Sequence, residues 1–187
     1  MAGSPVFAET TAWKIDTEKS EVTFGTFRGT RIAAQGTFNK IKGKILFDSS
    51  NISLSKVVAE IPIETLKTGI GARDSDLIGS KYFNSNVFPK ATFTSQTIHC
   101  DKTGKYVITG LFKLHGIQKT LDLQLTKPAI TISKTGHRKL AAAATTAIDQ
   151  TDYGLTLRLL HPDGFVRIHD LIIVHVSIEA SPEASRR

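Results

Sequence analysis

The most informative segment of the chain is Arg73-Asp74-Ser75-Asp76-Leu77, continued by Tyr82-Phe83 and by Phe88-Pro89-Lys90-Ala91-Thr92-Phe93. Its first part is short and polar, and Asp74 can accept backbone N–H bonds at the start of a helix. We therefore predict a short helix over residues 75–81 that closes one end of the molecule. Its last part follows a proline and alternates as a strand does.

Alternation with a period of two dominates the rest of the chain and predicts antiparallel strands with one buried face. Four apolar sets show it: Val22 and Phe24; Val57, Ala59 and Ile61; Leu121, Leu123 and Leu125; Ile172, Val174, Val176 and Ile178. Residues 102–105 and 162–164 predict hairpin turns. Eight or so antiparallel strands are most economically closed into a barrel, because closure removes exposed edges.

Residues 141–144 are four consecutive alanines, which helix propensity alone would assign to a helix. The flanking Thr145, Thr146 and Ile148 favour a strand, and we predict a strand. Whichever alternate alanines point inward then add almost no bulk to the interior. The ten phenylalanines of the chain provide apolar walls or simply fill the core. Taken alone, the residues favour a filled core.

Composition indicates one soluble, folded domain, because 187 residues with 40% hydrophobic content suffice for one core. The formal net charge of +7 is scattered along the chain, which argues against a nucleic-acid surface. Contact with an anionic membrane surface suits such charge better. No apolar run reaches the roughly 18 residues of a membrane span. Cys100 is the single cysteine, so no internal disulfide can form, and we expect a half-buried thiol.

Three further segments accompany the central stretch in order along the chain. They are Trp13-Lys14-Ile15-Asp16 with Ser20-Glu21-Val22-Thr23-Phe24, Gly110 to Lys119, and Thr151-Asp152-Tyr153-Gly154-Leu155. With the central stretch, they resemble the signature of the YceI-like family of lipocalin-like, polyisoprenoid-binding proteins. The resemblance covers residues 13–180. It implies an all-β fold: a single extended eight-stranded antiparallel lipocalin-like barrel with a short helix near one rim.

The chain departs from that family pattern at Lys19 and Asp76, where histidine is usual, and at Gln150, where arginine is usual. All three are polar positions near the ends or mouth of the barrel. The resemblance therefore carries over the scaffold, but not the recognition of a particular head group.

The resemblance also implies an interior cavity in place of the filled core, and the non-catalytic binding, sequestration or transport of a long-chain amphiphilic lipid. Isoprenoid quinone, polyprenyl and fatty-amide compounds are the ligand types that we expect. No other cofactor is predicted. The apolar residues that we predict to line the cavity are Phe24, Phe38, Phe83, Phe93, Phe112, Leu123, Ala142, Ala144 and Val174.

Three residues are candidates for polar contacts at the barrel mouth. Arg28 and Arg31 flank a predicted hairpin turn and suit an anionic head group, although solvated loop arginines are the favoured alternative. His115 precedes Gly116 in a tight turn, where it could also hold the turn by bonding backbone carbonyls. For His115 this structural role is the favoured one.

Neither catalysis nor a metal site is predicted. The sequence has no nucleophile elbow and no cysteine-based zinc spacing. His169 and His175 share strand parity but lie about 20 Å apart along a strand, too far to bind one metal ion.

Residues 1–12 form an N-terminal extension and residues 181–187 a C-terminal tail around the barrel domain of residues 13–180. Small residues at Val6 and Ala8 are typical of the end of a secretory signal, and Met1-Ala2-Gly3-Ser4 reads as a cloning remnant in its place. We expect a periplasmic or secreted protein, and the resemblance implies a homodimer. The alternative function is a filled-barrel interaction or stress-response module without a bound lipid.

Overall fold

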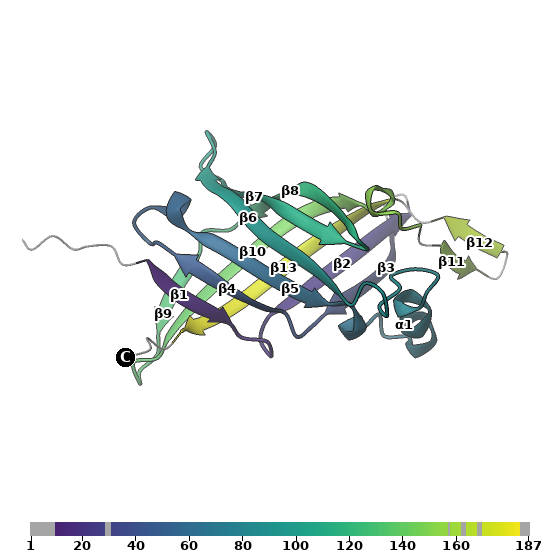
Figure 1. The fold of residues 1–187 in the computed structure, drawn as a ribbon, viewed down its shortest axis with the longest axis horizontal. Helices are drawn as coiled ribbons and strands as arrows, with labels where there is room; N and C mark the ends of the chain where they lie inside the picture. Colours follow the sequence, from purple (N-terminus) through teal and green to yellow (C-terminus); the bar gives the residue numbers. More distant parts are fainter. Residues whose placement is uncertain (1–9, 29–30, 157, 162–163, 168–169, 184–187) are drawn as a thin grey trace, which may run out of the picture.

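The computed structural model describes residues 10–28, 31–156, 158–161, 164–167 and 170–183, and strands dominate them (Figure 1). The strands in chain order are β1 Thr11–Ile15, β2 Glu21–Arg28, β3 Arg31–Phe38, β4 Lys42–Phe47, β5 Lys56–Pro62, β6 Lys90–Cys100, β7 Tyr106–Leu114, β8 Ile117–Leu125, β9 Ala129–Ile132, β10 Arg138–Asp149, β11 Arg158–His161, β12 Gly164–Arg167 and β13 Leu171–Pro182. The helical elements are α1 Gly71–Ile78 and the single 3₁₀ turns η1 Ile52–Leu54, η2 Ile63–Thr65 and η3 Gln150–Tyr153.

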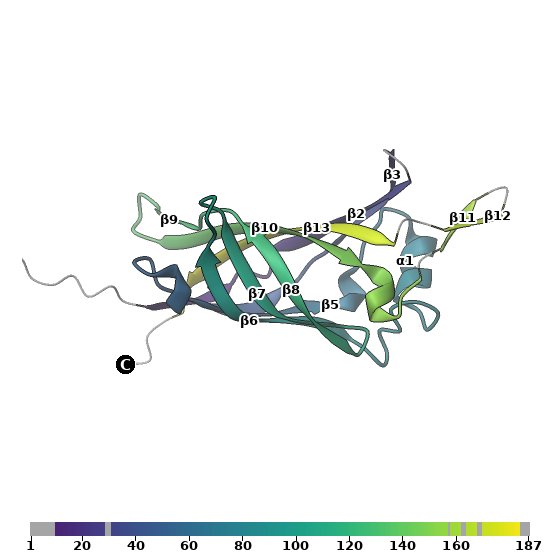
Figure 2. The ribbon, with the colours of Figure 1, turned by 90° about the horizontal axis from the view of Figure 1, so that it is seen from above.

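The barrel closes at β13, which pairs with β10 along one edge and with β1 and β2 along the other. Strands β1 and β2 pair with different stretches of β13, one after the other. On their other edges, β1 pairs with β4 and β2 pairs with β3. The antiparallel ring runs β13–β1–β4–β5–β6–β7–β8–β10 and returns to β13. Figure 2 shows this elongated ring from above. The predicted all-β, eight-stranded antiparallel barrel is confirmed.

The alanine run lies in the middle of β10, as the flanking residues predicted. Residues 140–149 pair with β13 over ten consecutive register positions, from Leu140 opposite Ala180 to Asp149 opposite Leu171. Pairing of this length outweighs the helix propensity of alanine, because strand formation depends on tertiary context.

A short helix lies at the rim of the barrel, as predicted, but it begins before the predicted position. Helix α1 starts at Gly71, and no side chain caps its first turn. The carboxylate of Asp74 instead accepts hydrogen bonds from the backbone N–H of Thr68, at 2.8 Å, and from its hydroxyl. Arg73 also bonds Thr68, through Nε to the hydroxyl at 2.8 Å. The prediction that Asp74 caps a helix over residues 75–81 is therefore wrong, because Asp74 binds the loop before the helix.

The end of the barrel opposite α1 is tightly packed. Trp13 is fully buried there, and Leu140 and Ala180 are each 1% exposed. The guanidinium of Arg138 lies 5.4 Å from the centre of the Trp13 ring, at cation–π distance. At the α1 end, β11 and β12 form a separate two-stranded ribbon beyond the rim (Figure 1).

Both predicted hairpins join paired strands. The β6–β7 turn is confirmed, and the Asp101 carboxylate accepts the backbone N–H groups of Thr103 and Lys105 in it. Strands β11 and β12 pair on either side of residues 162–163, which lie outside the described residues. Cys100 at the end of β6 is exposed, so the expectation of a half-buried thiol is wrong. Within the described chain, α1 and the 3₁₀ turns are too short or too polar to span a bilayer.

Candidate functional site

An apolar cavity runs along the inside of the barrel. Its volume is about 190 Å³, far above the roughly 10–15 Å³ that one water molecule needs. Its wall includes Ile52 and Pro128 toward one end and Phe83 and Leu155 toward the other. The side chains of the described residues therefore do not fill the interior completely.

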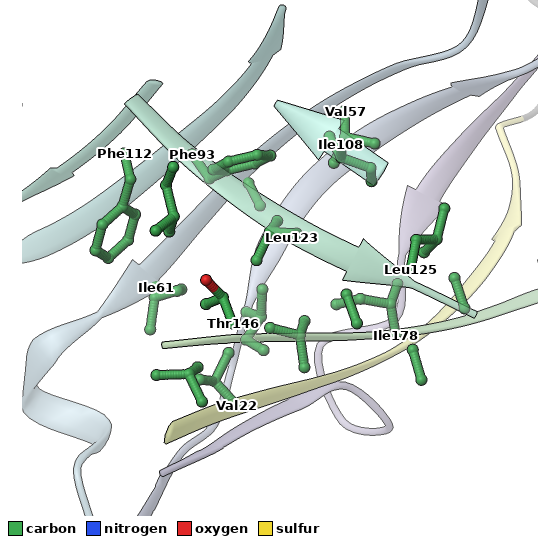
Figure 3. A pocket seen from close by; sticks show the side chains of 18 of the residues that line it. Val22, Val57, Ile61, Phe93, Ile108, Phe112, Leu123, Leu125, Thr146 and Ile178 are labelled. Atoms are coloured by element: carbon green, nitrogen blue, oxygen red, sulfur yellow. The ribbon is translucent and has the colours of Figure 1, made fainter. Parts of the chain in front are cut away.

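The apolar residues that recur at every second position along the sequence form this wall. All of the apolar sets in β2, β5, β8 and β13 that alternate in the sequence point into the cavity. Figure 3 shows Val22, Val57, Leu123 and Ile178 from these four strands around the same space. Since successive side chains of a strand point to opposite faces, each set occupies one face of its strand.

All nine residues predicted to line the cavity lie in its wall. Phe93 of β6 and Phe112 of β7 face it together, at paired positions of the two strands (Figure 3). Phe24 and Phe38 pack with their ring centres 5.5 Å apart, and Phe38 meets Phe83 edge-on at 6.0 Å. Their role as ligand contacts remains a prediction.

The cavity wall carries little polarity. Among the described residues that line it, none is charged, and three are polar: Ser55, Thr146 and Gln150. The Ser55 hydroxyl accepts the backbone N–H of Asp48 at 3.0 Å, and the Thr146 hydroxyl donates to the Asp122 carbonyl at 2.8 Å. An ion placed among these side chains would lose its hydration without gaining a charged partner, which is costly.

His115 holds the turn between β7 and β8. Its φ is 50° and that of Gly116 is 81°, and a two-residue type I′ hairpin requires positive φ at both positions. Its Nδ1 lies 3.2 Å from the carbonyl oxygen of Tyr153, and its ring meets Phe88 edge-on at 4.6 Å. His115 is not among the residues of the cavity wall. This geometry matches the role of His115 in holding the turn. A contact between His115 and a ligand at the barrel mouth stays a prediction.

Arg28 and Arg31 occupy opposite positions at the end of the β2–β3 hairpin. Their side chains lie outside the described part of the chain, so their contact with an anionic head group also stays a prediction.

A second concavity lies on the outer face of β2, β3 and β13, where the loop Lys67–Gly69 runs beside β3. We call it the outer pocket, and its volume is about 580 Å³. It is lined by Thr23, Phe24, Gly25, Phe27, Ile32, Gln35, Gly36, Thr37, Lys67, Thr68, Gly69, Ile173 and His175. Little in the sequence indicates this pocket, apart from the apolar Ile173 at an outward position of its strand.

Within the described residues, no three His, Cys, Asp or Glu side chains are grouped so that they could hold a metal ion.

A closed eight-stranded antiparallel barrel with an apolar internal cavity has the architecture of the small barrels whose interior has room for one ligand. Residues 13–180 match the model of the YceI-like domain, and the chain belongs to the YceI-like family.

Curated relatives agree with this assignment. A UPF0312 protein of Yersinia enterocolitica is 35% identical over 126 residues, which cover 66% of this chain and 63% of the relative. A UPF0312 protein of Shewanella sp. strain ANA-3 is 26% identical over 159 residues, which cover 83% of each chain.

Solved structures share the fold. BcnA of Burkholderia cenocepacia superposes with a TM-score of 0.74 at 17% identity, covering 89% of this chain and 99% of that one. A polyisoprenoid binding domain from Saccharophagus degradans superposes with a TM-score of 0.67 at 16% identity, covering 92% of this chain and 99% of that one.

Proposed function

We propose that this protein is a non-catalytic carrier that binds the chain of a long amphiphilic lipid inside its barrel. The ligand types are isoprenoid quinones, polyprenyl compounds and fatty amides. The observation that carries the proposal is the cavity wall, which is apolar along the barrel and has no charged side chain among its described residues. Membership of the family and the polyisoprenoid binding domain from Saccharophagus degradans support it.

The energetics suit a chain more than a compact polar molecule. Each buried CH₂ contributes about 0.8 kcal/mol, so ten of them contribute about 8 kcal/mol. Such a gross gain corresponds to about micromolar affinity before the cost of immobilising the chain is subtracted. Longer chains therefore bind more tightly, up to the length that the cavity accommodates.

The wall of β10 offers a matched test. Ala144 is 7% exposed and lies in the cavity wall, whereas Ala141 on the same strand is exposed and outside it. Ala144→Trp places an indole where the lipid chain would lie, and Ala141→Trp places it on the outer surface.

If the indole of the Ala144→Trp variant displaces about three CH₂ groups of the lipid from the cavity, the free energy of binding falls by about 2.4 kcal/mol. This loss corresponds to roughly 50-fold in affinity. We expect this loss for Ala144→Trp and unchanged affinity for Ala141→Trp, measured with a fluorescent fatty amide displaced by isoprenoid quinone. Near-ultraviolet circular dichroism checks that both variants fold. Equal affinities in the two folded variants would contradict the proposal and favour an interaction module that works without lipid.

We also propose that the protein is periplasmic or secreted and that it forms a homodimer, as the family resemblance implies, with peripheral contact to a membrane surface. Fractionation of cells that express the native gene tests the location, and an uncleaved precursor in the cytosol would contradict it. Sedimentation equilibrium tests the dimer, and a single species with the mass of one chain would contradict it.

A further inference from the structure

We propose that the outer pocket holds the polar head group of the same lipid whose chain occupies the barrel. This inference rests on the proposed function and adds a second site to it. The head group is one that presents hydrogen-bond acceptor oxygens, such as the carbonyl of a quinone or amide or the oxygens of a phosphate.

The cavity and the outer pocket have one lining side chain in common. Of the described residues that line either space, Phe24 alone belongs to both walls. Its ring packs on Phe38 from the cavity side. The Phe24 ring therefore borders both spaces, beside the strand backbone.

Gly36 of β3 makes room for that ring. A Cβ at this position would lie 2.6 Å from the Phe24 ring and 2.8 Å from the carbonyl oxygen of Lys67. Both distances are below van der Waals contact, so any side chain here would displace the ring or the loop. On the edge of β3 that faces away from β2, Thr37 exchanges both backbone hydrogen bonds with Lys67, at 2.8 and 2.9 Å. In our proposal, the lipid passes from the cavity to the outer pocket beside the Phe24 ring and this contact.

The two spaces differ in chemistry in the way that the two parts of an amphiphile do. The cavity wall has no charged residue among those described, whereas the outer pocket has the cation of Lys67, the amide of Gln35 and the ring of His175, all exposed. These side chains offer donors to acceptor oxygens. The Asp74 carboxylate is already bonded to Thr68, whose hydroxyl is the main cause of its lowered pKa, and the charge of Lys67 lowers that pKa further.

The head-group site is tested with three ligands of equal chain length: geranylgeranyl diphosphate, geranylgeraniol, and the saturated C20 isoprenoid hydrocarbon phytane, which has no oxygen. The variant is Lys67→Ala combined with Gln35→Ala. The control is Lys134→Ala, in the exposed β9–β10 turn at the opposite end of the barrel.

Two lost hydrogen bonds weaken binding by about tenfold. We expect this loss for the oxygen-bearing ligands in the double variant, with phytane affinity unchanged and no loss in the control. A loss confined to the diphosphate identifies phosphate as the head group, and a loss for the alcohol as well identifies any acceptor oxygen. Equal affinities of the double variant and the wild type for all three ligands, or an equal loss for phytane, would overturn the proposal.

The passage is tested by the rate of loading. Phe24→Ala removes the ring that borders both spaces, whereas Phe38→Ala removes its partner, which lines only the cavity. We expect geranylgeraniol to associate severalfold faster with Phe24→Ala than with Phe38→Ala in stopped-flow measurements. Equal rates would overturn the passage. If the wild type binds none of the three ligands, the proposed function fails and the outer pocket fails with it; chain binding without a head-group effect rejects the outer pocket alone.

Discussion

Two leucines of this barrel should respond very differently to truncation if the interior is a cavity. Leu123 of β8 lines the cavity and is half-buried, whereas Leu66 is 1% exposed, packs in the core and is not in the cavity wall. Leu→Ala in a packed core costs about 2–5 kcal/mol, of which part is the new void at about 24 cal/mol per Å³. Leu66→Ala creates such a void, but the space left by Leu123→Ala joins one that already exists.

We therefore expect a loss in the free energy of unfolding of about 3 kcal/mol for Leu66→Ala and about 1.5 kcal/mol for Leu123→Ala. For a chain of this length, the difference corresponds to about 3–6 °C in Tm. Urea unfolding of delipidated protein, followed by tryptophan fluorescence, gives both free energies on the same scale. Equal losses would mean that Leu123 is packed on all sides, as in a filled barrel, and would rule out an open cavity beside it.

Two further predictions concern the rim near α1. The hydrogen bond from the Thr68 hydroxyl is the main cause that lowers the pKa of Asp74 below its usual 3.8. The ionised Asp74 carboxylate therefore stabilises the fold above about pH 4, and this stabilisation is lost as the pH falls through the lowered pKa. Asp74→Asn should cost about 1–2 kcal/mol at pH 7, with a difference from the wild type that shrinks below pH 4 in acid titrations of unfolding; a difference independent of pH would contradict it. Gly116→Ala should lower Tm more than Gly104→Ala: both glycines have φ near 80°, but a Cβ at Gly116 would lie 2.8 Å from Phe88, whereas one at Gly104 meets nothing within 4 Å. Equal shifts in a calorimetric scan would show that Phe88 moves away freely.

Much of the barrel could be predicted from the sequence because strand alternation is local. Once a strand is paired, the parity of its side chains follows, and so Leu123 and Val174 lie in the wall as the alternation indicates. The resemblance then decided between a filled and an open interior, which composition alone could not do.

Other features depend on side-chain and backbone contacts that the alternation of apolar residues does not encode. Asp74 binds Thr68 across a turn, and this moved the helix start away from its expected residue. The outer pocket forms only where β3 meets the Lys67 loop, 30 residues further along the chain from Thr37. The pairing of Thr37 with Lys67 cannot be inferred from a window of neighbouring residues.

Lipid binding inside the barrel is tested most simply by native mass spectrometry of the purified protein, followed by organic extraction and identification of any lipid. We expect a mass that exceeds that of the protein by one long-chain molecule per chain, either co-purified or taken up when isoprenoid quinone or fatty amide is added. A protein mass without ligand that stays unchanged after both additions would contradict it and leave the barrel as an interaction module.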